Sequence, residues 1–320
     1  MFLGVGAINP TFLTLQNIWL CLNSSVVYTV VAVGISLVLI TGEIDVSVGA
    51  TLGMAAAISG TMIRNGQPWG LAIICALLVG LLIGCVNGFG VVVLKIPSII
   101  MTLGINGIVR GLIYVYTDGK WIENIPFDFK LLSQGRLFGT VTFFYLGALI
   151  LIVLVHLFLT KSKRGRYFAA IGDNIGGATL LGIPVDATKF SAYAMCGVFA
   201  AIGGVIFVSR VGFVTPLAGN GYEMKVIAAC VLGGISLSGG VGSVIGAGVG
   251  AAIMASISRV LIFIGLSSDY DDTITGILLI IIVVSDALLR RRTVAKARRE
   301  RLSAKTLAYD LEVKGGAGNE

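Results

Sequence analysis

The 320-residue chain is 56% hydrophobic and only 12% charged, with a mean hydropathy of +0.97. A soluble domain carries about 25% charged residues, so this composition excludes an ordinary soluble protein. The net charge of +7 does not indicate nucleic-acid binding, because eight of the Lys and Arg residues lie together in the segment 290–305, directly after an apolar run. Basic clusters beside a membrane span mark its cytoplasmic side.

Apolar runs of roughly 20 residues recur along the chain, and a helix of that length crosses the hydrocarbon core of a bilayer. The runs predict an all-α polytopic membrane protein with about 8–10 transmembrane helices. They cover residues 25–42, 46–63, 69–94, 98–116, 138–160, 190–210, 225–240, 243–265 and 273–289. The seventh run is short and rich in Gly and Ser, so we expect a broken or re-entrant helix there. Such segments occur only where protein or a watery cavity covers the freed backbone groups.

Positive charge sets the expected orientation, because loops rich in Lys and Arg stay in the cytoplasm. The basic segment 161–166 and the basic tail are separated by an even number of predicted crossings, so we expect both to be cytoplasmic. The expected organisation is a transmembrane domain over 1–289 and a cytoplasmic tail over 290–320. Before Asn9 and Pro10 the chain has only about eight apolar residues, too few to span a bilayer. We expect either an N-terminus outside the membrane or, preferably, the tail of a longer first span.

The residue types that carry catalysis or bind metals are sparse. The five cysteines are scattered without a CxxC pair, which indicates neither a metal site nor a disulfide framework. His156 is the single histidine, and it lies near the end of an apolar run. The sequence contains neither GxSxG nor HExxH, so a membrane enzyme is disfavoured.

The longest polar segment inside the predicted membrane domain is 161–189, KSKRGRYFAAIGDNIGGATLLGIPVDATK. A phosphate-binding loop needs G-x-x-x-x-G-K-[ST], which is absent from the sequence, and the GDNIGG glycines lack the dinucleotide-binding register. Asp173 and Asn174 suit a turn or a helix cap. Small residues followed by Leu180 and Leu181 predict a short surface helix that a partner's groove would accept. An ordinary intracellular loop is the alternative.

This segment resembles the coupling loop of permease subunits in bacterial ABC importers, in particular the branched-chain amino acid/ribose-type permease family. The matching residues are Gly165, Arg166, Ala170, Gly172, Asn174, Ala178, Gly182 and Ile183. Three further stretches resemble blocks of the same family in the same order: LITGEIDVSVGATLGM (39–54), LLIGCVNGFGVVVLKIPSIIMTLG (81–104) and GNGYEMKVIAACVLGGISLSGGVGSVIGA (219–247). The stretch TDGKWIENIP (117–126) looks most like the subset that imports autoinducer-2, and also like rhamnose-type permeases.

The resemblance implies a permease subunit that moves autoinducer-2 or a monosaccharide across the bacterial inner membrane. It implies as partners a second permease subunit, different or identical, two ATP-binding subunits and a periplasmic substrate-binding protein. In this family the coupling loop docks into the ATPase subunit and transmits its closure to the membrane helices. ATP-Mg would therefore be used by the partner, and this chain would bind no cofactor. Membrane lipids are expected partners and nucleic acid is not.

Polar side chains inside apolar runs are costly and therefore point to function. Asn87 lies in the third run, whereas Thr102, Asn106 and Arg110 follow one another at intervals of four residues in the fourth run. Residues spaced in this way share one helix face. We expect this face to line the path of a polyhydroxylated ligand. Helix–helix hydrogen bonding is the alternative, and for Arg110 so is snorkelling to the interface.

The few acidic residues suggest less. Glu43 and Asp45 flank a break between two runs, where they are expected to pair, to cap the next helix through Asp45, or to touch the ATPase. Arg210 and Glu223 bracket an outside loop, which is expected to be solvated; contact with a periplasmic binding protein is the alternative. Glu and Asp are almost absent from the predicted spans, which disfavours the alternative function, an ATPase-independent secondary transporter or channel for a small polar solute.

Overall fold

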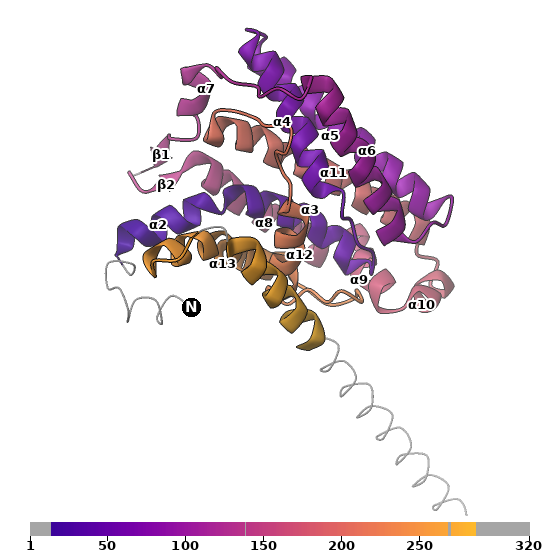
Figure 1. Cartoon of the computed structure of the whole chain (residues 1–320). Helices are drawn as coiled ribbons and strands as arrows, with labels where there is room; N and C mark the ends of the chain where they lie inside the picture. Colours follow the sequence, from indigo (N-terminus) through magenta and orange to yellow (C-terminus); the bar gives the residue numbers. More distant parts are fainter. Residues whose placement is uncertain (1–13, 138, 268–269, 286–320) are drawn as a thin grey trace, which may run out of the picture. The chain divides into compact units, whose positions relative to one another are not determined.

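The computed structural model describes residues 14–137, 139–267 and 270–285, and helices account for most of them (Figure 1). The predicted all-α polytopic fold is confirmed. Within the described residues, five helices are long and apolar enough to cross a membrane: α5 (Trp69–Val92), α6 (Ser98–Thr117), α8 (Phe143–Lys161), α11 (Val185–Val211) and α13 (Val244–Phe263). A sixth span results if α2 (Leu15–Ser24) and α3 (Val26–Ile40), which meet at a bend of 48°, are counted together.

Every predicted apolar run contains a helix, but several helices are shorter than the runs. α4 (Val48–Arg64) has 17 residues and α12 (Tyr222–Leu232) has 11, and a further helix covers 271–285. The prediction of about 8–10 spans counted these shorter helices as full crossings. α2 was not predicted, because its mixture of Gln, Asn and Ser interrupts the apolar pattern.

The loop after α6 is more structured than the sequence indicated. It contains α7 (Phe127–Leu131) and a small hairpin in which β1 (Arg136–Leu137) pairs with β2 (Val141–Thr142). The hairpin delays the start of the next span, so that α8 begins at residue 143 and not at 138.

The tightest packing of the bundle lies between α5 and α11, which run side by side (Figure 1). A Cβ added to Gly197 of α11 would meet the carbonyl oxygen of Gly80, and a Cβ added to Gly80 would meet the carbonyl oxygen of Gly197. A Cβ at Gly84 would likewise meet the carbonyl oxygen of Tyr193. Small residues let helix backbones approach closely inside a membrane, which explains why these two apolar helices carry glycines at their crossing.

The predicted broken segment is confirmed at α12, whose 11 residues extend only about 16 Å against a hydrocarbon core of about 30 Å. The chain reaches α12 through residues 212–221, which run along the glycine face of α4. There, a Cβ at Gly53 would meet the Ala218 carbonyl oxygen, and a Cβ at Gly49 would meet the Gly219 carbonyl oxygen.

This non-helical run and α12 together connect the two ends of the bundle. At one end Val214 exchanges backbone hydrogen bonds with Ile122, N to O distances of 2.8 and 2.9 Å. At the other end, beyond α12, the Gly240 amide donates to the Ile40 carbonyl at the end of α3 over 2.9 Å. Half of this connection is not helical, so its backbone polar groups need cover from other protein atoms inside the bundle. α4 provides this cover.

The chain divides after Leu278 into two compact units. The described part of the second unit, residues 279–285, is helical, and the Ser285 hydroxyl donates to the Ile281 carbonyl over 2.7 Å. The predicted boundary at 289/290, the basic tail and the hypothesis about residues 1–13 lie outside the described residues.

Candidate functional site

The segment that resembles a coupling loop folds into two short helices, α9 (Lys163–Asp173) and α10 (Ile175–Leu180). The Ser162 hydroxyl caps α9 by accepting from the Gly165 amide over 2.8 Å. The Asn174 side chain caps α10 by accepting from the Gly177 amide over 2.8 Å, which confirms the cap expected at Asp173–Asn174. Gly182 then turns the chain with a φ of +70°, a conformation that glycine adopts without strain, and α11 begins.

The eight residues predicted for coupling divide between two faces of this segment. Gly165 and Ala178 are buried, and a Cβ at Gly165 would meet the carbonyl oxygen of Phe158 in α8. Ala170, Gly172 and Ile183 are partly buried, whereas Arg166, Asn174 and Gly182 are exposed. One face is therefore seated on the bundle and the other faces outward.

Gly172 lies where three elements meet. A Cβ added to it would meet the Ile40 carbonyl oxygen at the end of α3 and the Gly240 amide nitrogen in the loop after α12. Gly239 and Gly240, with φ values of +81° and +77°, bring that loop against Gly42 and Gly172. We call these four glycines with Ile40 the glycine junction. It joins α9 to both α3 and α12 through backbone contacts alone.

The outward face of α10 is apolar. Leu180 is 91% exposed and Leu181 is 81% exposed. Beside them, a hollow of about 530 Å³ is lined by Ile175, Thr179 and Ile183, together with the first residues of α11. Large exposed apolar side chains next to polar residues typically mark a protein–protein contact.

An ion pair joins the start of α11 to the linker between α3 and α4. The Lys189 ammonium lies 2.5 Å from a Glu43 carboxylate oxygen, and both side chains are largely buried. Glu43 therefore pairs with α11 and not with Asp45, which corrects one of the expectations for these acids. The ion pair binds the linker just after Gly42 of the glycine junction.

The rest of that linker is held by hydrogen bonds from two of the predicted path residues. Asp45 is buried and accepts from the amide and the hydroxyl of Ser47, at 2.9 and 2.7 Å. Asn87 of α5 donates to the Ser47 hydroxyl over 2.7 Å, and the Thr102 hydroxyl of α6 accepts from the Val46 amide over 3.1 Å. Asp45 thus fixes the turn that precedes α4 through Ser47, which is the N-cap position.

Of the remaining two path residues, Arg110 contacts the beginning of α12, and Asn106 lies one turn earlier on α6. The Arg110 guanidinium donates to the Ala218 carbonyl over 2.6 Å and lies 3.9 Å from a carboxylate oxygen of Glu223. Four buried atoms here have no hydrogen-bond partner among the described residues: Asn106 Oδ1, Arg110 Nε, Arg110 Nη2 and Glu223 Oε2. Arg110 Nη2 and Glu223 Oε2 are the two atoms of the 3.9 Å ion pair, whereas Asn106 Oδ1 and Arg110 Nε lie outside it. An unpaired buried polar atom costs about 1–3 kcal/mol, so the polar strip formed by Asn106, Arg110 and Glu223 has hydrogen-bonding capacity that the described residues do not use.

One expectation from the sequence is corrected at this point. Glu223 does not lie in a solvated loop, because α12 begins three residues earlier than the predicted run and buries it. Arg210 lies in the last turn of α11 and donates to the carbonyls of Asn23 and Ser24, at 2.8 Å each. An acidic residue is favourable in the first turn of a helix, and this signal could have placed Glu223 inside α12.

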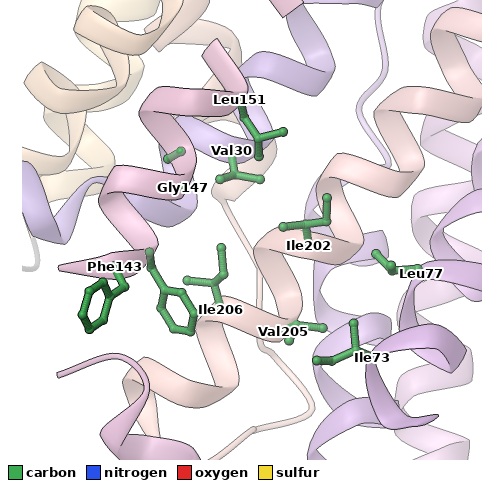
Figure 2. Close-up of a pocket in the computed structure, with 11 residues that line it drawn as sticks. Val30, Ile73, Leu77, Phe143, Gly147, Leu151, Ile202, Val205 and Ile206 are labelled. Atoms are coloured by element: carbon green, nitrogen blue, oxygen red, sulfur yellow. The ribbon is translucent and has the colours of Figure 1, made fainter. Parts of the chain in front are cut away.

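A second cavity, of about 390 Å³, differs from the polar strip in its chemistry. It lies between α3, α5, α8 and α11, and every side chain drawn in Figure 2 is hydrocarbon. Ligand sites combine apolar walls with a few placed polar groups, which this cavity lacks. It therefore offers nothing to recognise hydroxyl groups. His156 lies in α8, and the described residues contain no group of three or more His, Cys, Asp or Glu side chains arranged around a metal position.

Comparison with known proteins identifies the family. Residues 17–283 match the family model described as branched-chain amino acid transport system / permease component. The chain is 41% identical over 317 residues to the autoinducer 2 import system permease protein LsrC of Yersinia enterocolitica, covering 98% of this chain and 88% of the relative. The corresponding protein of Yersinia pseudotuberculosis is 40% identical over 315 residues, 97% of this chain and 89% of the relative. That of Escherichia coli is 39% identical over 301 residues, 94% and 88%.

No solved structure matches the chain. The chain belongs to the branched-chain amino acid transport system permease family, and it is a multi-pass membrane protein that serves as the permease component of a transport system.

Replacing Gly172 tests the glycine junction. Gly172→Ala places a methyl group against two backbone atoms that cannot rotate away, and overpacking of this kind costs about 1–3 kcal/mol. We expect membrane insertion to be retained, the melting temperature of the detergent-solubilised chain to fall by about 5 °C, and substrate uptake to be lost. The larger Gly172→Trp should act at least as strongly.

The matched control is Gly176→Ala, because a Cβ there meets nothing closer than 3.4 Å. Normal uptake by Gly172→Ala, or an equal loss in the control, would show that the junction has no special role.

Proposed function

We propose that this chain is the permease subunit of an ATP-binding-cassette importer that moves autoinducer-2 or a monosaccharide across the bacterial inner membrane, with its C-terminus in the cytoplasm. The single observation that carries the proposal is the polar strip along α6 and α12, buried within a chain of the permease family and not fully satisfied by its own hydrogen bonds. Its proposed partners are a second permease subunit, two ATP-binding subunits and a periplasmic substrate-binding protein. ATP-Mg is used by the ATP-binding subunits, and this chain binds no cofactor.

The chemistry of the strip fits a polyhydroxylated solute. Asn106 Oδ1 and Glu223 Oε2 are able to accept hydrogen bonds, whereas Arg110 Nε and Nη2 are able to donate them, and all four atoms are buried. The hydroxyl groups of a sugar-like ligand are both donors and acceptors. The relatives named above as autoinducer 2 import permeases support the choice of ligand class.

The α9–α10 segment is the proposed contact with an ATP-binding subunit. Leu180 and Leu181 present the apolar surface that a groove on that subunit would cover, and Arg166 adds a cation on the exposed side. When the ATP-binding subunits close, they move α9, and the glycine junction transmits this movement to α3 and α12 because its backbone contacts leave no slack.

The two ends of the polar strip are each connected to this junction. Thr102 holds the linker that follows Gly42, and the Glu43–Lys189 ion pair ties the same linker to α11. At the other end, Glu223 lies at the start of α12, whose far end leads into Gly239 and Gly240. A shift of α9 therefore changes the distance between α6 and α12, which is the step that alternating access requires.

A secondary transporter is the alternative, and one observation favours it. Asp45, in the linker between α3 and α4, and Glu223, in the first turn of α12, are buried acids. Buried acids are the groups that couple protons or sodium ions. Both acids have local partners, Asp45 in Ser47 and Glu223 in Arg110, which is the reason to prefer the importer.

Co-purification separates these functions. The membrane-extracted chain would be captured from cells grown with candidate sugars, and its partners identified by mass spectrometry. The proposal predicts an ATP-binding subunit; a second, different permease would favour the autoinducer-2 class, whereas this permease alone would favour a monosaccharide importer. Absence of an ATP-binding subunit under every condition, together with uptake driven by a proton or sodium gradient, would establish the secondary transporter.

Asn106→Ala tests the substrate path. Losing one hydrogen bond to a ligand in a buried site costs about 1–2 kcal/mol, so the KM for uptake should rise about tenfold. The complex should still assemble, as measured by co-purification. Gly107→Ala is the control, since its new Cβ meets nothing within 4 Å. Loss of assembly with Asn106→Ala would instead assign the strip to helix packing.

A further inference from the structure

A cavity of about 460 Å³ opens where the end of α8, α9 and the start of α11 meet. Its walls combine two kinds of side chain. Phe158, Phe168 and Met195 supply apolar surface, and the rings of Phe158 and Phe168 meet edge to face with centroids 5.9 Å apart. Arg164, Tyr167, Thr188 and Ser191 supply polar groups, and Arg164 is exposed.

Positive charge gathers around this cavity. Lys161, Lys163, Arg164 and Arg166 are all exposed, and the first turn of α9 contains no acidic residue. The Arg164 guanidinium makes no hydrogen bond or ion pair with any described residue. The N-terminal end of α9 adds the positive end of a helix dipole to the same place.

The position of the cavity along the spans sets its surroundings. α8 and α11 are both long and apolar enough to cross a membrane, α8 ends at Lys161 and α11 begins at Val185. The cavity therefore lies at the ends of two spans, where the hydrocarbon core gives way to lipid head groups. A molecule bound there meets an apolar wall on one side and a guanidinium on the other.

We propose that this cavity binds an anionic phospholipid, with its phosphate on Arg164 and an acyl chain against Phe158 and Met195. A planar guanidinium binds phosphate oxygens through charge-assisted hydrogen bonds, and basic pockets between transmembrane helices accept acidic head groups. An acyl chain would cover the aromatic and thioether surface of the cavity. A free phosphate ion would leave that surface uncovered.

This cavity adjoins the hollow beside Leu180 and Leu181, with which it shares Pro184 and Ala187, but neither leucine lines it. Arg166 is two residues from Arg164, and side chains at that spacing point to different sides of a helix. Of these two, only Arg164 lines the cavity. A bound lipid would fix α9 against α8 and α11 and would thereby set how firmly the α9–α10 segment is held against the bundle.

The test uses the full chain purified in detergent and native mass spectrometry with added phosphatidylglycerol or phosphatidylethanolamine. We expect phosphatidylglycerol to bind at least about tenfold more tightly than phosphatidylethanolamine, since only the former has net charge. Arg164→Gln should weaken phosphatidylglycerol binding about tenfold, the effect of losing a charge-assisted hydrogen bond, and Arg164→Lys should restore part of it.

Lys163→Gln is the charge-matched control, because Lys163 does not line the cavity, and it should change the affinity by less than about twofold. Equal losses in Arg164→Gln and Lys163→Gln would overturn the proposal in favour of general attraction to a basic surface. Equal binding of the two lipids would also overturn it. Displacement of the lipid by millimolar inorganic phosphate would assign the site to the free anion and contradict the role of the acyl chain.

Discussion

Backbone contact at Gly172 is the constraint on which the coupling between the two candidate sites depends. A glycine is required there because the carbonyl of Ile40 and the amide of Gly240 occupy the space that a Cβ would need. Two backbones packed against a third have no rotamers with which to absorb a displacement, so movement of α9 must displace α3 and the loop after α12. The surrounding glycines Gly42, Gly239 and Gly240 all have positive φ, and they allow the three backbones to come this close.

The break in the chain before α12 brings polar groups into an otherwise apolar bundle. An unbroken span would have carried its backbone hydrogen bonds internally and presented only side chains to α6. The break instead places the carbonyls of residues 212–221 along α4 and starts a new helix with Glu223 beside Arg110. The polar strip is therefore built from one intact helix and one broken helix, and the break connects it to the glycine junction.

The sequence predicted the helical class, the presence of a helix in each apolar run, the shortness of the seventh helix and the cap at Asn174, because each depends on local hydrophobicity or local hydrogen bonding. It could not predict the burial of Glu223, because that depends on how the start of α12 packs beside Arg110 of α6. Nor could it find the Glu43–Lys189 ion pair, since these residues are 146 positions apart. The roles of Asn87 and Thr102 as supports of the linker also depend on partners that are distant in the chain.

The central claim is that a separate ATP-binding subunit drives this permease through the α9–α10 segment. Site-specific photo-cross-linking in membranes tests it most directly, with a photoreactive residue in place of Leu180. The control position is Val115, which is 76% exposed and lies near the C-terminal end of α6. The account predicts a covalent product with the co-expressed ATP-binding subunit from position 180 and none from position 115. No such product from position 180, or equal products from both positions, would contradict it.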